Sequence, residues 1–259
     1  MSHFKLNPLA TVVTLLGLYT LSALVLNFSS SLFIQVLIIF ITALISYYGF
    51  LFLSGKHKML SNSIITTCIL FLLLSPGETY IEFLYPLFAV LTAFFIKFFI
   101  EYKNLHPINP AVGGLLILIL IPIISSMPEP FISWWGAAFN GSWSLLLLSP
   151  ILLYVLFKFK KYGIFLSFIV SYFMLQYFLG TSMDVMKFYI TTGTLYFMAG
   201  VMLVDPKTSP IIMREQIVFG IFAGVLFGML QYHSISYSEL LSIGIMNFLF
   251  FVFTLVCKR

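Results

Sequence analysis

The chain alternates ten apolar stretches with short polar connections. A helix needs about 20 apolar residues to cross a bilayer, with a lower bound near 17, and several of these stretches lie close to that bound. Length alone therefore leaves a nine-helix or reentrant arrangement open. The stretches are Pro8–Phe28, Ser31–Leu53, Ser61–Ser75, Tyr80–Ile100, Asn109–Ser125, Trp143–Phe157, Tyr162–Leu179, Phe188–Val204, Ile217–Gln231 and Leu240–Val256.

The distribution of basic residues favours the count of ten. If ten helices alternate from a cytoplasmic start, Lys187 is the only one of the 13 basic residues on the outer side. Basic residues concentrate in cytoplasmic loops, so this asymmetry also sets the orientation. We predict an all-α integral membrane protein with about ten transmembrane helices, multi-pass in the bacterial inner (plasma) membrane, with both termini in the cytoplasm. The short stretches then imply tilt, local bilayer thinning or burial inside the bundle.

The composition narrows the class of protein further. Of the 259 residues 61% are hydrophobic and 8% are charged, so the solvent of this chain is largely membrane lipid. The net charge of +5 is spread over short loops and forms no patch, which argues against a nucleic-acid partner. The first stretch is longer than a signal-peptide core and is expected to stay in the membrane. No two histidines have helical metal-ligand spacing, and no soluble-enzyme motif is present, so we predict neither a metal centre nor a catalytic residue.

We expect one polytopic membrane domain made of two half-repeats, at approximately 1–126 and 143–259. Five helices in each half would force the second half to insert upside down relative to the first. Inverted repeats of this kind surround a midplane site in many transporters, commonly with short or broken helices at the centre.

Two neighbouring segments form the first candidate site. Asn109 followed by Pro110 predicts a helix start, with Asn as the N-cap and Pro at the first helical position. Gly113 and Gly114, one turn later, would let another backbone or a flat ligand approach closely. Lys97 lies one turn before the cytoplasmic end of the fourth stretch, where a lysine ordinarily extends to the lipid headgroups.

Two further segments carry hydroxyl and carboxylate groups. Ser63, Thr66 and Thr67 begin the third stretch, and their hydroxyls either bond their own backbone or line a polar cavity against the fifth stretch. Asp205 ends the eighth stretch, where the helix dipole disfavours a carboxylate. We expect a compensating partner: Lys207, Lys97, the N-terminus of the next helix, a cation or a ligand hydroxyl.

The ordered set of these segments resembles the RnfD/NqrB family. Its members are membrane subunits of the Rnf complex and of the Na⁺-translocating NADH:quinone oxidoreductase. The matching features are a Ser/Thr-rich helix start (Ser63 to Thr67), a helix ending in Lys97, Asn109-Pro110-Ala111 twelve residues later, and Asp205-Pro206-Lys207-Thr208-Ser209-Pro210. The resemblance covers roughly residues 55 to 232.

The resemblance implies a membrane subunit of an ion-coupled electron-transport complex, with other subunits as partners and with bound flavin or quinone. In the family, FMN is attached covalently to a threonine. The corresponding region here, Trp135 to Trp143, contains no threonine, so the chain resembles a divergent member with a non-covalent flavin (FMN or riboflavin). A stand-alone transporter or channel for a small polar solute is the alternative, and it would use the same inverted-repeat cavity. The implied cofactor-binding residues are Ser63, Thr66, Thr67, Lys97, Asn109, Pro110, Gly113, Asp205 and Thr208.

Overall fold

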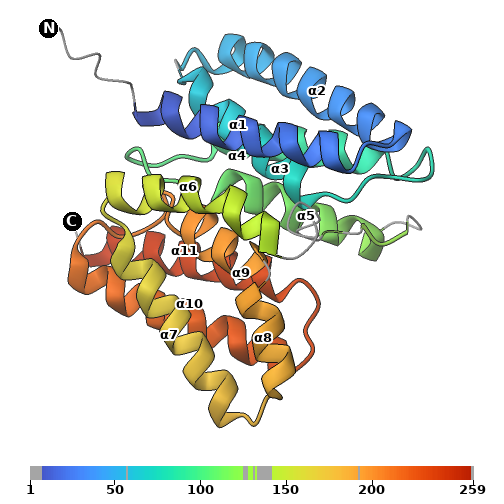
Figure 1. The fold of residues 1–259 in the computed structure, drawn as a ribbon. Helices are drawn as coiled ribbons and strands as arrows, with labels where there is room; N and C mark the ends of the chain where they lie inside the picture. Colours follow the sequence, from blue (N-terminus) through green and yellow to red (C-terminus); the bar gives the residue numbers. More distant parts are fainter. Residues whose placement is uncertain are drawn as a thin grey trace, which may run out of the picture.

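The regular elements of the chain are helices throughout the described residues, which are 8–56, 58–124, 128–130, 132, 142–191 and 193–257 of the computed structural model (Figure 1). The helices are α1 (Pro8–Leu26), α2 (Ser30–Ser54), α3 (Leu60–Leu73), α4 (Leu84–Phe99), α5 (Pro110–Ile124), α6 (Ser142–Lys158), α7 (Tyr162–Phe178), α8 (Met183–Thr191), α9 (Gly193–Phe197), the π-helix η2 (Met198–Met202), α10 (Met213–Tyr232) and α11 (Ser238–Cys257). Each predicted apolar stretch falls on helix, so the all-helical prediction is confirmed.

Local chemistry explains where the longest helix begins and ends. At the start of α2, the Ser29 hydroxyl accepts a hydrogen bond of 3.2 Å from the Leu32 N–H, which satisfies one of the free donors of the first turn. At its end, Gly55 adopts a left-handed conformation with φ of 62°, and its N–H bonds the Leu51 carbonyl. The uninterrupted apolar run between them gives a helix of 25 residues.

In the part of the chain that the structure describes, four helices, α1, α2, α10 and α11, are long and apolar enough to cross a membrane, and six shorter apolar helical segments accompany them. Many large apolar side chains on the outside of the bundle are exposed; Phe52 is 88% and Val256 is 70% exposed. Water-soluble proteins rarely expose apolar surface on this scale, whereas lipid tolerates it. The chain therefore has the character of a multi-pass membrane protein, and the count of ten spans stays a prediction.

The stretch predicted as one helix over Phe188–Val204 begins earlier, as α8 at Met183. Its described residues continue as α9 and change to the π-helix η2 at Met198. The sequence prediction of its start was wrong because Met183–Lys187 contains Asp184 and Lys187 and reads as a polar loop, although it folds as a helical turn.

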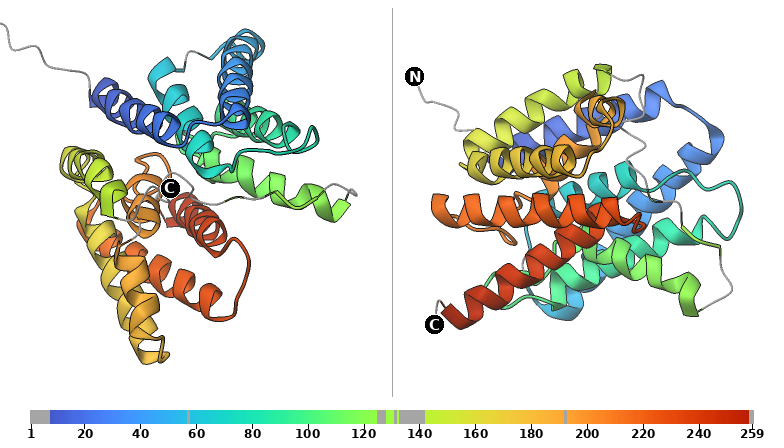
Figure 2. Two further views of the ribbon diagram at one scale, coloured as in Figure 1. Left: turned by 45° about the vertical axis from the view of Figure 1, so that its right-hand side comes forward. Right: turned by 90° about the horizontal axis from the view of Figure 1, so that it is seen from below.

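Several helix contacts recur in the two halves of the chain. In the first half α1 packs on α3, α2 on α4, and α4 on α5; in the second half α6 packs on α9 and η2, α7 on α10, and α10 on α11. Between the halves, α1 contacts α6 and α5 contacts α11. The two halves form adjoining groups, coloured blue to green and yellow to red in Figure 2. Three helix contacts of the first half therefore have counterparts in the second, whereas the contacts of α3 with α4 and α5 have no counterpart of similar extent among the described residues.

Small residues allow the closest of these contacts, between α7 and α10. Gly220, Gly224 and Gly228 follow one another at four-residue spacing on α10 and face α7. A Cβ at Gly220 would lie 2.0 Å from Ser167 Oγ, and one at Gly224 would lie 2.2 Å from Ser171 Oγ. Absence of side chains here lets the two backbones approach closely, as at helix contacts in membranes.

Candidate functional site

A cavity of about 440 Å³ lies at the boundary of the two halves. Its polar lining includes Lys58, Lys97, His106, Asn109, Asp205 and Lys207. Its apolar lining includes Val12, Ile65, Ile69, Val155, Val201 and Val204, contributed by α1, α3, α6, η2 and the segment after η2. Helix ends supply most of the polar groups, because the free N–H and C=O groups of a helix terminus attract polar side chains.

Asn109 is the N-cap of α5, as the sequence predicted. Its Oδ1 accepts a hydrogen bond of 3.0 Å from the Ala111 N–H, and Pro110 stands at the first helical position. Its Nδ2 donates to the Met202 carbonyl at 3.4 Å and to Asp205 Oδ2 at 3.3 Å. The cap residue therefore joins α5 to the end of η2 and brings two predicted site residues into direct contact.

The carboxylate of Asp205 accepts hydrogen bonds from N–H groups, and within the described residues no lysine side chain contacts it directly. Besides the amide of Asn109, the Lys207 backbone N–H donates to Asp205 Oδ1 at 3.1 Å. The backbone carbonyl of Asp205 accepts hydrogen bonds from the Thr208 N–H at 3.1 Å and from the Ser209 hydroxyl at 2.7 Å. The carboxylate thus organises a tight turn and also lines the cavity. Neither of the two expected ion pairs, with Lys207 or with Lys97, is present within 4.0 Å among the described residues.

Lys97 is buried, and the expectation that it extends to the headgroups was wrong. Its side chain is inside the bundle at 6% exposure, in the last turn of α4. Its Nζ donates to Thr66 Oγ1 at 2.7 Å and to the Asn62 carbonyl, both on α3. The start of α3 is close enough to accept these bonds because α3 packs on α4.

Lys97 and Asp205 therefore place an ammonium and a carboxylate on one cavity without pairing with each other. No carboxylate in the described part of the chain lies within 4.0 Å of Lys97 Nζ. A buried charge is normally paired with a countercharge or with a full set of hydrogen-bond partners. The ammonium group of Lys97 has one N–H beyond its two bonds, and Lys97 lines the cavity. The site is suited to a ligand that accepts from Lys97 and donates to Asp205.

Of the remaining predicted residues, Thr66 and Pro110 line the cavity and the others do not. Thr66 lines the cavity, but both Thr66 and Thr67 bond backbone carbonyls one turn earlier, at 3.1 and 2.9 Å. Ser63 and Thr208 are 2% and 1% exposed, and their hydroxyls have no partner among the described residues. Gly113 faces α4, since a Cβ there would lie 2.5 Å from Ile96 Cδ1. A neighbouring helix, rather than a ligand, uses the space beside this glycine.

Three residues of the site were missed by the sequence analysis, and the first is Glu101. The Glu101 carboxylate forms ion pairs with Lys58 Nζ and, at 3.0 Å, with Lys207 Nζ. His106 Nε2 lies 4.0 Å from the same carboxylate. Burial alone would raise the pKa of Glu101, but the hydrogen bonds of Lys58 and Lys207 lower it to about 2. The signal in the sequence was that Glu101 is a lone carboxylate among basic loops.

Asn247 on α11 is the second missed contributor. Its Oδ1 accepts from the Asn109 N–H at 3.1 Å and its Nδ2 donates to the Thr208 carbonyl at 3.2 Å. It is fully buried, and it links the α5 start to the turn after Asp205. A single asparagine in an otherwise apolar membrane helix is a signal for such a role, because polar side chains at that depth seek partners.

Lys161, the third, fixes the same turn from the opposite side. It precedes α7, is 2% exposed, and donates to the Ser209 carbonyl at 3.2 Å, Ser209 Oγ at 3.0 Å and the Pro210 carbonyl at 2.7 Å. Burial lowers the pKa of Lys161 to about 8, and the nearby negative charge of Asp205 opposes that shift. All three donors of the ammonium are used, so the turn carrying Asp205 is held in place.

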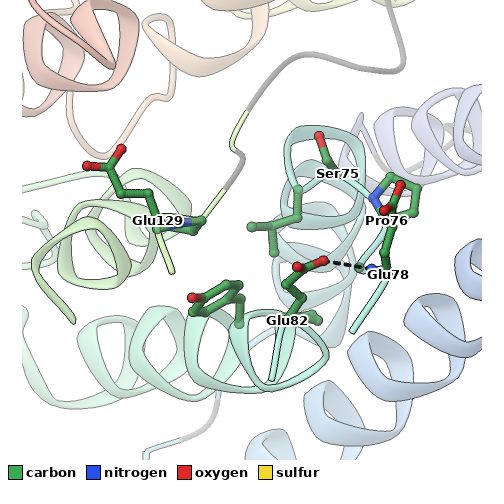
Figure 3. A pocket seen from close by; sticks show the side chains of 10 residues that line it. Ser75, Pro76, Glu78, Glu82 and Glu129 are labelled. Carbon is green, nitrogen blue, oxygen red and sulfur yellow. Dashed lines mark hydrogen bonds between the residues drawn. The ribbon is translucent and has the colours of Figure 1, made fainter. Parts of the chain in front are cut away.

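A second hollow, of about 290 Å³, lies near the opposite ends of α3 and α4 and is bordered by three glutamates (Figure 3). Glu82 accepts from the Glu78 N–H at 2.7 Å, a bond that lowers the pKa of the Glu82 carboxyl. Figure 3 shows the Glu129 carboxylate pointing away from the other two. The three groups do not converge on one point, and they define no binding site.

Comparison of the chain with protein-family models gave no match, and comparison with curated proteins gave none either. The class of protein therefore rests on the fold and the site: a multi-helix chain of membrane character with a charged and apolar cavity between its halves. The region that would carry the covalent-flavin motif, 135–143, lies outside the described residues except for 142 and 143.

Proposed function

We propose that this chain is the membrane subunit of an Rnf- or NQR-like electron-transport complex and holds a flavin non-covalently in the cavity between its halves. The observation that carries the proposal is the unpaired Lys97 and Asp205 on one cavity with an apolar wall. A flavin has a broad apolar ring and a pyrimidine edge that presents one N–H donor between two carbonyl acceptors. Lys97 would donate a hydrogen bond to a flavin carbonyl, and Asp205 would accept one from the flavin N–H.

The size and chemistry of the cavity favour flavin over quinone. Ligand cavities for molecules of this size have about 300–1,000 Å³, and this one has about 440 Å³. A quinone offers acceptors only, so it would give Asp205 no donor beyond the amide of Asn109 and the backbone N–H of Lys207. When bound, flavin would supply the redox chemistry, and the positive charge of Lys97 would stabilise the negative charge of its reduced form.

The equivalent helix pairs of the two halves support the proposed five-plus-five inverted repeat. A site at the boundary of such halves is the usual arrangement in membrane transporters. The one-sided distribution of basic residues supports an orientation in the bacterial inner membrane with both termini in the cytoplasm. The cavity would then open toward the cytoplasmic side, where Lys58 and Lys207 lie. Sister subunits would provide the electron donor and acceptor.

Flavin titration of the purified protein tests the proposal. Riboflavin fluorescence should be quenched on binding to wild-type protein in nanodiscs, and riboflavin should raise its thermal stability. Lys97→Met and Asp205→Asn should each weaken binding about tenfold or more, since a hydrogen bond to a charged group contributes about 1.5–3 kcal/mol. Lys187→Met, at a side chain 72% exposed on α8, is the matched control and should bind as wild type. Wild-type protein that neither quenches nor is stabilised would refute the proposal.

A stand-alone transporter for a small polar solute is the second candidate, and the π-helix η2 beside the cavity favours it. Val201 of η2 lines the cavity, and π-helical turns within helices are frequent at functional sites. Flux of solute into liposomes at a rate independent of redox poise would support this candidate against the electron-transport subunit.

A further inference from the structure

A further hollow lies beside the cavity, and a carboxylate with two lysine partners stands between the two spaces. The hollow has a volume of about 460 Å³ and is lined by Lys56, Lys58, Glu101, Lys103 and Asn104. We call it the entry hollow. Lys58 lines both spaces, Lys207 lines the cavity but not the entry hollow, and Glu101 lines the entry hollow but not the cavity. The ion pairs of Glu101 with Lys58 and Lys207 therefore form part of the partition between the two spaces.

This partition joins the two halves of the chain. Glu101 follows α4 and Lys58 precedes α3, so both belong to the first half. Lys207 belongs to the second half, in the turn after η2. The pair of Lys58 with Glu101 is thus internal to one half, whereas the bond of 3.0 Å from Lys207 Nζ to Glu101 Oε1 crosses the boundary between the halves.

The side chain of Lys207 can leave Glu101 while its backbone stays in place. The Lys207 N–H donates to Asp205 Oδ1 at 3.1 Å, and the Lys207 carbonyl accepts from the His106 N–H at 3.4 Å. The side chain is 36% exposed, against 8% for that of Glu101, so water can replace the bond that it loses.

Glu101 tolerates the departure of Lys207 because it keeps a second partner. The ion pair with Lys58 remains, and no buried carboxylate is left without a countercharge. The bond between the halves can therefore open and close at a modest cost in free energy.

We propose that the ion pair of Lys207 with Glu101 is a gate between the entry hollow and the cavity. When the pair is formed, it separates the two spaces; when Lys207 turns out into water, they join into one path for a polar molecule. The pKa of Glu101, about 2, keeps this carboxylate ionised at neutral pH, so displacement of Lys207 rather than protonation opens the gate. The gate goes beyond the proposed function, and it acts on any molecule that enters the cavity.

A thiol introduced into the cavity reports the state of the gate without any ligand. Val155→Cys places this thiol on the cavity wall contributed by α6, and Cys257→Ser removes the exposed native thiol. Cys68, which is buried on α3 and does not line the cavity, stays as an internal control. The rate at which a water-soluble methanethiosulfonate modifies the introduced thiol in nanodiscs then follows the fraction of molecules with an open gate.

Lys207→Met should raise that rate about tenfold or more, since the lost hydrogen bond between charged groups changes the open population by this factor. Lys207→Arg can still donate to Glu101 and should keep the wild-type rate. Lys56→Met is the matched control, because it removes the same charge from the entry hollow at a lysine with no carboxylate within 4.0 Å in the described ranges. It should also keep the wild-type rate.

A cationic and an anionic reagent separate opening of the gate from a change in local charge. Loss of a positive charge alone would accelerate the cationic reagent and slow the anionic one, whereas an open gate accelerates both. Equal rates for Lys207→Met and Lys56→Met would overturn the proposal. Acceleration of the cationic reagent alone would overturn it, and so would equal acceleration at Cys68, which would show a loosened bundle. Failure of riboflavin to bind would refute the proposed function and leave the gate standing.

Discussion

Replacing Gly224 with alanine should destabilise the bundle at the contact between α7 and α10. The added Cβ would lie 2.2 Å from Ser171 Oγ, 2.6 Å from the Phe168 carbonyl oxygen and 3.1 Å from the Tyr172 nitrogen. The serine hydroxyl can rotate away, but the Phe168 carbonyl belongs to the backbone of α7. The two helices must therefore move apart.

The expected cost is about 1–3 kcal/mol, the usual range for overpacking a close contact. In a chain of this length it would lower Tm by roughly 2–4 °C for each kcal/mol. Thermal unfolding of purified protein in one fixed detergent gives the measurement. Adding Ser171→Ala to Gly224→Ala should restore only part of the loss, because the contact with the Phe168 carbonyl remains.

Gly17→Ala is the matched control, since a Cβ at Gly17 meets no atom within 4 Å. It should be neutral, or stabilise α1 by up to about 1 kcal/mol through the better helix propensity of alanine. Equal Tm values for Gly224→Ala, Gly17→Ala and wild type would refute the reasoning, because the close approach of the two backbones would then have no energetic consequence.

Three further predictions concern the turn and the charges around the cavity. Lys161→Met should lower stability by about 1–3 kcal/mol, because buried acceptors lose their donor; thermal unfolding should separate it from a silent Lys158→Met, and equal values would contradict the structural role. Stability contributed by Glu101 should be complete above pH 4.5 and be lost as pH falls from there toward its folded pKa of about 2; Glu101→Gln should flatten the acid side of the stability profile measured by thermal unfolding, and an unchanged slope would exclude this source. Asp205→Asn should impair coupling or assembly more than Glu129→Gln, measured as membrane yield of the complex and its ion-coupled activity, and equal, negligible effects would refute the assignment.

The helical elements and one cap were predictable because their causes are local. Apolar runs fixed the positions of the helices, and Asn109-Pro110 predicted the start of α5 from cap chemistry alone. The sequence also predicted that something approaches closely at Gly113 and Gly114. It did not predict what approaches, because a glycine shows that space is needed and leaves open whether a helix or a ligand uses it.

The contacts that the sequence did not reveal depend on long-range approach. The position of Lys97 in α4 permitted an extension to the headgroups, whereas the family resemblance implied a role at the cofactor site. Its burial follows from where α3 offers carbonyl and hydroxyl acceptors. Glu101 meets Lys58 and Lys207 across 43 and 106 residues of chain. Helical periodicity cannot predict such long-range ion pairs, because they depend on how whole helices pack.

The contact of Asn109 with Asp205 has a consequence for how the protein is made. These residues are 96 positions apart and belong to different halves, so the cavity wall that they form together cannot exist while only the first half has left the ribosome. Any cofactor must be loaded after the last helices have inserted, and Asn247 of α11 completes the support of that surface. Truncated chains should accumulate in the membrane empty.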